Sequence, residues 1–254
     1  MCPNFIYTWQ SSLLFVLVGT VLGSLGAGGA LLALPIFLMV LKVPMELAVP
    51  ATTAVVGFAA LSGAWEAWTA KRLELSVLGR FAVPGMVFSA LGSWISHKIP
   101  GAILHWSFLA VVLFAGARLL LPRRASTETE NTPKPDPTGL AVAGAGTGAL
   151  MGLFGVGGGF LAMPALILRG GLSASTAVGV SLGAMALNAA SSLAVQIPSG
   201  NLRWTLVAPA LIAVLLGMEI GGWVSKRMPE RVQERVLGIL LLGVAVSLVV
   251  AQIR

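Results

Sequence analysis

Two glycine-rich stretches interrupt the apolar sequence, and each combines residue types that can bind an anion through the backbone. The first covers residues 26–29 and the second covers residues 155–159. Each precedes a short apolar run with a proline near its start, Pro35 or Pro164. A helix that begins after such a loop points its first N–H groups, and the positive end of its dipole, back into the loop. Because glycine lets a ligand approach these amides closely, both stretches are candidate anion-binding loops.

The composition indicates the environment in which these loops lie. Hydrophobic residues make up 57% of the 254 residues and charged residues only 10%, whereas soluble domains have about 25% charged residues. Apolar runs long enough to cross a bilayer recur along the chain. The net charge of +7 comes from Lys and Arg that lie between these runs, which is typical of topology signals and lipid contacts. We therefore predict a membrane protein that does not bind nucleic acid.

Enzyme, metal and cofactor chemistry have little support in the sequence. Cys2 is the single cysteine, and His97 and His105 are the two histidines, so neither an intrachain disulfide nor a dedicated metal site is expected. No Walker-type Gly-Lys-Ser/Thr occurs, and "GVSLG" at 179–183 lies on an apolar helix without the strand that a nucleophile elbow requires. The N-terminus lacks the basic residues of a signal peptide, so we expect it to be retained.

The sequence repeats itself at an offset of 129 residues. Beyond the glycines, the offset aligns Trp94 with Trp223 and Pro100 with Pro229. Paired Trp and Pro in one register over about 80 residues indicate a duplication. We therefore predict a first repeat at 1–122, a polar linker at 123–138 and a second repeat at 139–254.

Each repeat is expected to contain three spanning helices and one shorter pair. The expected spans are 47–69, 75–96 and 102–121 in the first repeat and 175–197, 204–225 and 232–252 in the second. The shorter pairs flank the glycines, at 11–25 with 30–41 and at 139–154 with 160–168. Residues 30–41 would rise only about 18 Å, too little for a bilayer core of about 30 Å. Each pair is therefore either a re-entrant hairpin or one span with an unwound middle.

The distribution of basic residues favours the hairpin. If each pair returns to its starting side, twelve of the 16 Lys and Arg lie on the linker side; if each pair crosses once, the division is nine to seven. The positive-inside rule favours the first arrangement and places the linker in the cytoplasm. Three crossings per repeat give the repeats opposite orientations. The predicted fold is an all-α polytopic membrane protein of two inverted repeats, each a glycine-broken re-entrant helical hairpin plus three spanning helices.

The predicted substrate site combines the glycine loops with polar residues of the following helices. Irregular backbone at membrane depth is tolerated only where protein or a watery cavity surrounds it, so the two loops should meet near the midplane. The hydroxyls of Thr52, Thr53 and Ser181, at the start of the helix after each hairpin, either complete a cage around an oxyanion or bond to carbonyls of their own helix. The amide of Asn188, two turns further on, either contacts the substrate or joins helices. The candidates are Gly26, Ala27, Gly28, Gly29, Thr52, Thr53, Gly155, Val156, Gly157, Gly158, Gly159, Ser181 and Asn188. In contrast, the four-residue spacings of Gly19 with Gly23 and of Gly217 with Gly221 are typical of close helix packing.

Glu66 and Glu219 are the two carboxylates expected within the spans. An ionisable group inside a membrane is a functional hypothesis by default, so each is a candidate for proton coupling. Glu66 also lies near Lys71 and Arg72, and its side chain could instead reach the membrane surface.

Two motifs carry a resemblance to a known family. The stretches "GTVLGSLGAGGALLALPIFL" and "GALMGLFGVGGGFLAMPALI", followed by "AVPATT" and "AVGVSL", resemble the two repeats of the sulfite exporter TauE/SafE family. The resemblance implies a bacterial or archaeal inner-membrane permease for sulfite, sulfonates and related sulfur-containing or organic anions. The first motif departs from the second at Ala30, where the second has Gly159, so the two half-sites need not bind equally.

From the residues, three functions stay open: a coupled secondary transporter for small anions, an anion channel without coupling, and a membrane scaffold or subunit whose glycines only pack helices. The expected partners are a small anion and the lipid bilayer, and the sequence does not decide whether the chain forms a homo-oligomer.

Overall fold

The computed structural model describes residues 9–25, 30–120 and 136–225, together with residues 239, 243 and 246 in helical conformation. The described part contains helices and no strand. Its elements are α1 (Trp9–Leu25), α2 (Ala30–Pro35), the π-helix η1 (Ile36–Val40), α3 (Met45–Thr69), α4 (Leu75–Ser96), α5 (Gly101–Leu120), α6 (Pro137–Phe154), α7 (Gly159–Gly170), α8 (Ala174–Gln196), the 3-10 helix η2 (Ile197–Ser199) and α9 (Trp204–Ser225). The expected span at 232–252 and the first glycine loop lie outside the described residues.

Five of these helices are long and apolar enough to cross a membrane: α3, α4, α6, α8 with its extension to Ser199, and α9 through Trp223. Four of the five coincide with predicted spans, which confirms an all-helical protein with several membrane-length helices. The fifth, α6, belongs to a predicted hairpin, and its 18 residues would rise about 27 Å. The predicted span at 102–121 coincides with α5, a helix of 20 residues, whose apolar stretch Gly101–Ala115 is the part with described side chains.

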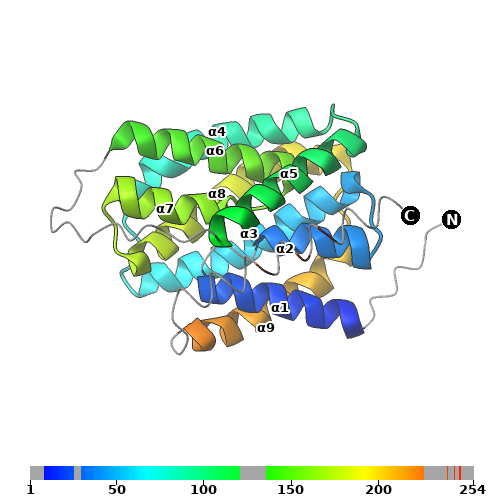
Figure 1. The fold of residues 1–254 in the computed structure, drawn as a ribbon, viewed down its shortest axis with the longest axis horizontal. Coiled ribbons are helices and arrows are strands. Elements are labelled where there is room, and N and C mark those ends of the chain that lie inside the picture. The colour runs from blue at the N-terminus through cyan, green and yellow to red at the C-terminus, as the bar shows by residue number, and fades with distance from the viewer. Residues whose placement is uncertain are drawn as a thin grey trace.

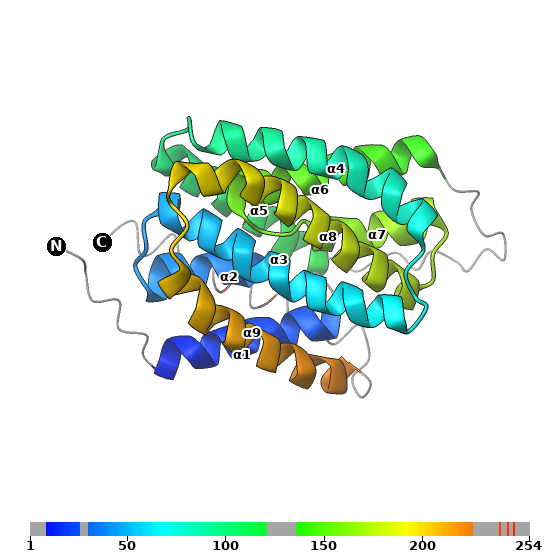
Figure 2. The same cartoon turned by 180° about the vertical axis from the view of Figure 1, so that it is seen from behind.

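The helices form three layers, with α4 and α6 side by side in one outer layer and α1 and α9 in the other (Figures 1 and 2). Between the two pairs, α3 packs against α8. The described helices of the two halves, with α2 and η1 taken together, begin and end within two residues of the 129-residue offset, and α4 and α9 match it at both ends. The offset found in the sequence therefore also relates the helix boundaries.

Glycine allows the two outer helix pairs to approach closely. A Cβ atom on Gly148 would overlap the carbonyl oxygen of Gly85 in α4, and a Cβ atom on Gly19 would overlap that of Val214 in α9. These two contacts are related by the 129-residue offset. Gly217 meets the backbone of α1 in the same way, so the prediction that these glycines pack helices is confirmed.

Local signals at the helix ends explain where the elements begin. Asp136 caps α6 by accepting a hydrogen bond from the N–H of Gly139 at 3.0 Å, and Pro137 occupies the first turn, where a missing N–H is harmless. Ser173 caps α8 by accepting from the N–H of Thr176. The caps and the prolines therefore define the starts of α6 and α8.

Contacts between helix ends identify the two faces of the molecule. At one face, Asp136 at the start of α6 pairs with Arg169 at the end of α7, and Arg72 after α3 contacts Ser175 at the start of α8. At the other face, the start of α3 and the ends of α4 and α8 surround one cavity. We call these the linker face, because Asp136 belongs to the predicted linker at 123–138, and the distal face.

Tryptophan side chains are exposed near both faces. Trp65, Trp68 and Trp223 lie towards the linker-face ends of α3 and α9, and Trp94, Trp106 and Trp204 lie towards the distal ends of α4, α5 and α9. All six are more than half exposed. Two bands of tryptophan at the ends of apolar helices are typical of a membrane protein, in which the rings lie at the lipid headgroups.

Candidate functional site

The second glycine loop joins α6 to α7 and changes the direction of the chain. Gly155 ends α6 in the left-handed region with φ 67°, a conformation that side chains disfavour. A Cβ atom there would also overlap the carbonyl oxygen of Val49 in α3. Gly158 then precedes α7, and its carbonyl accepts from the N–H groups of Leu161 and Ala162. Gly155 is therefore required by the backbone turn and by contact with α3.

A small buried cavity lies at the start of α7. It has a volume of about 10 Å³, room for about one water molecule. Residues of α4, α6, α7, α8 and the loop line it: Phe81, Thr147, Met151, Gly157, Gly158, Gly159, Ala162, Ser181, Ala184, Met185 and Asn188. Five predicted site residues, Gly157, Gly158, Gly159, Ser181 and Asn188, therefore lie around one space, which we call the inner cavity.

Two polar atoms at the inner cavity lack a hydrogen-bond partner. Ser181 and Asn188 are each 2% exposed, and Ser181 Oγ and Asn188 Oδ1 bond to no group in the described part of the chain. Buried polar groups in proteins are nearly always paired, because an unpaired one costs about 1–3 kcal/mol. Thr147 behaves differently, since its hydroxyl donates to the carbonyl of Gly144 at 2.9 Å. The hydroxyl and the amide are thus available to a ligand.

The electrostatic character of the inner cavity comes from backbone and neutral side chains. The first N–H groups of α7 have no acceptor within their own helix and carry the positive end of its dipole. No lysine or arginine is among the described residues that line the cavity. Such a site can attract a single negative charge, and its hydroxyl and amide can bond to oxyanion oxygens.

The two central glycines of the loop, Gly157 and Gly158, are packed against different groups. A Cβ atom on Gly157 would overlap the thioether of Met185, whereas one on Gly158 would lie 2.8 Å from Cα of Thr147 in α6. Methionine is flexible and can move, but helix backbone cannot. Gly157 is therefore covered by the flexible side chain of Met185, whereas the lack of a side chain at Gly158 lets the loop pack closely on α6.

Other predicted site residues lie away from the inner cavity. Thr53 Oγ1 donates to the carbonyl of Val49 at 2.8 Å, the own-helix bond that the sequence left as one alternative. Thr52 is fully buried in α3, and its hydroxyl has no partner within the described residues. Gly155 and Val156 are buried beside the cavity without lining it. Gly26, Ala27, Gly28 and Gly29 fall outside the described residues.

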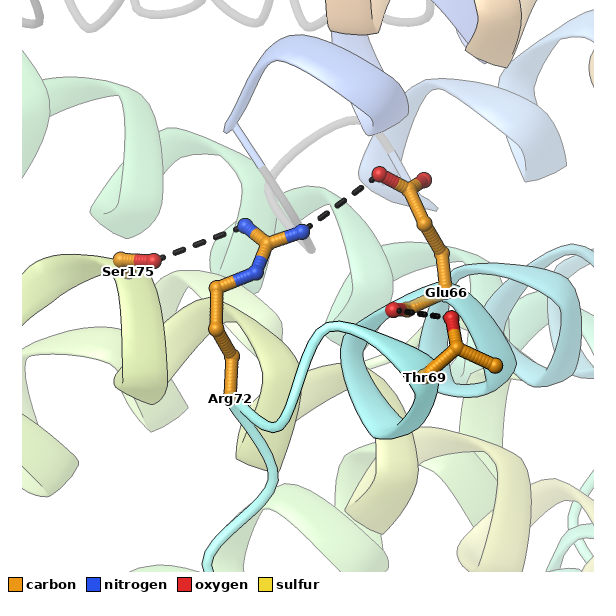
Figure 3. A network of polar contacts seen from close by, with 4 residues as sticks. All are labelled: Glu66, Thr69, Arg72 and Ser175. Carbon is orange, nitrogen blue, oxygen red and sulfur yellow. Dashed lines mark hydrogen bonds and ion pairs between the residues drawn. The ribbon is translucent and has the colours of Figure 1, made fainter.

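Glu66 lies at the linker face, at the end of α3. Its side chain is 78% exposed and pairs with Arg72 at 3.4 Å, while the other guanidinium nitrogen of Arg72 lies 3.5 Å from Ser175 Oγ (Figure 3). Glu219 is also exposed, on α9. Neither carboxylate lines the inner cavity, so a role in proton coupling stays a prediction. Among the described residues, no group of three or more His, Cys, Asp or Glu could hold a metal ion.

Sequence reasoning missed four larger lining residues, Phe81, Thr147, Met151 and Met185. They belong to α4, α6 and α8, and their convergence depends on helix packing that a linear motif does not display. A comparison of the two repeats could have identified part of this lining, because the offset pairs Thr147 with Val18 and Asn188 with Ala59. At these two positions the second repeat carries a polar residue and the first repeat an apolar one, whereas Ser181 is paired with Thr52, so that position is polar in both repeats.

The apolar helices, the tryptophan bands and the buried polar cavity define a multi-pass helical membrane protein. The model of the sulfite exporter TauE/SafE family matches residues 12–248, so the chain belongs to this family.

Curated relatives are similar over nearly their whole length. A Bacillus subtilis (strain 168) protein named "Probable membrane transporter protein YdhB" is 25% identical over 225 residues, covering 86% of this chain and 90% of the relative. Proteins from two Xylella fastidiosa strains, Temecula1 and 9a5c, each named "Probable membrane transporter protein", are 28% identical over 245 residues, covering 92% of this chain and 91% of each relative. No solved structure matches the chain.

Proposed function

We propose that this chain is a secondary transporter for small anions, most directly sulfite, sulfonates or related sulfur-containing and organic anions. The observation that carries the proposal is the pair of buried, unpartnered polar atoms, Ser181 Oγ and Asn188 Oδ1, beside the amino terminus of α7. Family membership and the names of the curated relatives support transport as the role.

The site favours a singly charged substrate. A helix amino terminus carries about half an elementary charge, which offsets only part of the dehydration of an anion. Without a lysine or arginine to balance a second charge, bisulfite or a monocarboxylate should bind more readily than sulfate. Glu66 is highly exposed and pairs with Arg72, so we place the coupling proton on the substrate itself and keep Glu66 and Glu219 as the alternative.

Binding requires the inner cavity to open. Its volume of about 10 Å³ holds one water molecule but not a sulfite ion with four heavy atoms. Met185 covers Gly157, and rotation of this flexible side chain would uncover the loop. The described structure therefore corresponds to a closed state in the proposed transport cycle.

The proposed topology is a pair of inverted repeats with re-entrant hairpins in a bacterial or archaeal inner membrane. The N–H of Asp136 donates to the carbonyl of Arg169 at 2.9 Å, which supports a hairpin of α6 and α7 that returns to the face where it entered. Arg72 and Arg169 lie at this face and Lys98 and Arg203 at the distal end. With the remaining basic residues of the sequence, this distribution favours a cytoplasmic linker.

Counterflow in proteoliposomes tests the proposal. Labelled sulfite, sulfoacetate, sulfate and acetate would be measured with and without a pH gradient, alongside Glu66→Gln and Glu219→Gln. A transporter should exchange monoanions and show little movement of sulfate, sodium or choline. A scaffold would move none of these solutes, and a channel would conduct without counterflow. Preference for a dianion at every pH would contradict the anion site proposed here.

A further inference from the structure

A second and larger cavity lies at the distal face, with a volume of about 190 Å³. Residues at the start of α3, the end of α4, the start of α5 and the end of α8 line it, together with Asn201. Its polar lining consists of Glu46, Ser96, His97, Gln196 and Asn201. We call this space the outer cavity, and the site described above does not include it.

Gln196 is the buried polar residue of the outer cavity. Its side chain is fully buried, its Nε2 donates to Ser192 Oγ at 2.6 Å, and its Oε1 has no partner in the part of the chain that the structure describes. The Gln196 amide is therefore incompletely paired, as the Asn188 amide is at the inner cavity. A buried amide with unused bonding capacity is available to a ligand or to water.

A row of buried polar side chains extends from Asn188 at the inner cavity to Gln196 at the outer cavity. Asn188, Ser192 and Gln196 follow each other at four-residue spacing on one face of α8, and α4 presents Ser89 and Ser93 to them. Ser89 Oγ donates to the carbonyl of Asn188 at 2.7 Å, and Ser93 Oγ donates to the carbonyl of Ser192 at 3.3 Å. All five side chains are at most 2% exposed. We call these residues the polar seam; its α8 part extends about 12 Å along the helix axis.

The corresponding contact in the other half is apolar. The 129-residue offset pairs the seam positions with Ala59, Gly63 and Ala67 of α3 and with Met218 and Gly222 of α9, and these two helices also pack together. None of these five positions carries a hydroxyl or an amide, and a side-chain contact between the two helices joins Ser62 Oγ to Met218 Sδ at 3.9 Å, on the exposed side. Ser89 and Ser93 join α4 to α8, but the unpaired oxygens of Asn188 and Gln196 keep bonding capacity of the kind found along substrate and ion pathways.

We propose that the substrate crosses between the inner and outer cavities along the polar seam, and that the apolar contact of α3 with α9 stays closed. Serine hydroxyls and the two amides replace water around a small anion as it passes. Gln196 is the first buried group that the anion meets from the distal face. Glu46 also lines the outer cavity, but its side chain is exposed to solvent, which screens its charge. The inference rests on the proposed anion transport and adds the route.

Cysteine accessibility tests the route. In a Cys2→Ser background, Ser192→Cys and Gln196→Cys would be compared with their equivalents by the offset, Gly63→Cys and Ala67→Cys. Each variant would be treated with an anionic sulfonatoethyl methanethiosulfonate reagent, in vesicles of both orientations. Because the offset relates the two halves, Gly63 and Ala67 match Ser192 and Gln196 in their place along the helix, but Ala67 lies near the linker face, where α3 ends, and Gln196 near the distal face, where α8 ends. Each variant is therefore compared by its reactivity from the face nearer to it.

The route predicts that Gln196→Cys, treated from the distal face, reacts at least about tenfold faster than Ala67→Cys, treated from the linker face. Ser192→Cys should react more slowly than Gln196→Cys but faster than Gly63→Cys, and its modification should stop transport. Equal rates at the two contacts, or unreactive Ser192→Cys and Gln196→Cys in protein that still transports anions, would overturn the route and leave the proposed function intact. If Gln196→Cys does not elute as a single species, Ser192→Cys, which replaces one oxygen by sulfur, decides alone.

Discussion

Asn188→Leu separates substrate binding from helix packing because the two roles predict opposite changes in stability. Asn188 is 2% exposed and its Oδ1 lacks a partner, and its amide lies against Gly85 of α4. Leucine keeps the branched shape and removes the unpaired polar atom, which costs about 1–3 kcal/mol when buried. The free energy of unfolding should therefore stay constant or rise by up to this amount.

Transport should change in the opposite direction. A hydrogen bond to a charged partner contributes about 1.5–3 kcal/mol, which corresponds to about a tenfold to hundredfold loss of apparent affinity. The assay pairs the thermal unfolding midpoint of the purified protein with the concentration dependence of sulfite counterflow. We expect a higher midpoint together with weak counterflow.

Ser191→Ala is the matched control for this experiment. Ser191 Oγ donates to the carbonyl of Met86 at 2.8 Å, so it joins α8 to α4 outside the polar seam. Its loss should lower the free energy of unfolding by about 0.5–1.5 kcal/mol and leave transport unchanged. If Asn188→Leu behaves like this control, or keeps its full affinity for sulfite, Asn188 does not contact the substrate.

Three further predictions follow from described contacts and from the repeat. Gly157→Ala should lower transport while the yield of folded protein stays near normal, because the added methyl displaces only the flexible side chain of Met185; a parallel loss of yield would instead indicate packing. The N–H of Gly139 in the first turn of α6, and then the guanidinium of Arg169, lower the pKa of Asp136. The ionised carboxylate therefore stabilises the fold at pH values above its ordinary pKa of 3.8. This stabilisation is lost as the pH falls through the lower pKa of the folded state. The midpoint difference between wild type and Asp136→Asn should therefore be constant near neutral pH and decrease only below about pH 4. Impermeant labels at Thr132 and Arg254 should be reached from opposite faces, because three crossings separate them, and labelling from one face would contradict the inverted repeats.

The helix positions could be predicted because hydrophobic length and breaking residues are local properties of the chain. The expected span at 75–96 has the same bounds as α4, and the expected span at 204–225 has the same bounds as α9. The glycine loop was located in the same way, since consecutive glycines are visible in the sequence. The offset of 129 residues then related one half to the other.

The lining of the inner cavity could be predicted only in part. Gly157 belongs to the glycine motif, and Ser181 and Asn188 lie on the helix that follows the hairpin. Thr147 and Phe81, in contrast, reach the cavity because α6 packs against α4. The polar seam was missed although its α8 residues recur every four positions. A comparison of the two repeats for polar residues that only one of them carries would have identified it.

The close pairing of α1 with α9 also determines the order in which the protein can be assembled. Gly19 and its partner carbonyl on α9 are separated by about 200 residues, and ribosomes add about 5–20 residues per second. The first helix therefore waits roughly 10–40 s in the bilayer before its glycine face finds a partner, while α4 meets α6 much sooner. Until α9 is synthesised, that face can contact only lipid or an insertion chaperone, and α9 then completes the packing of α1.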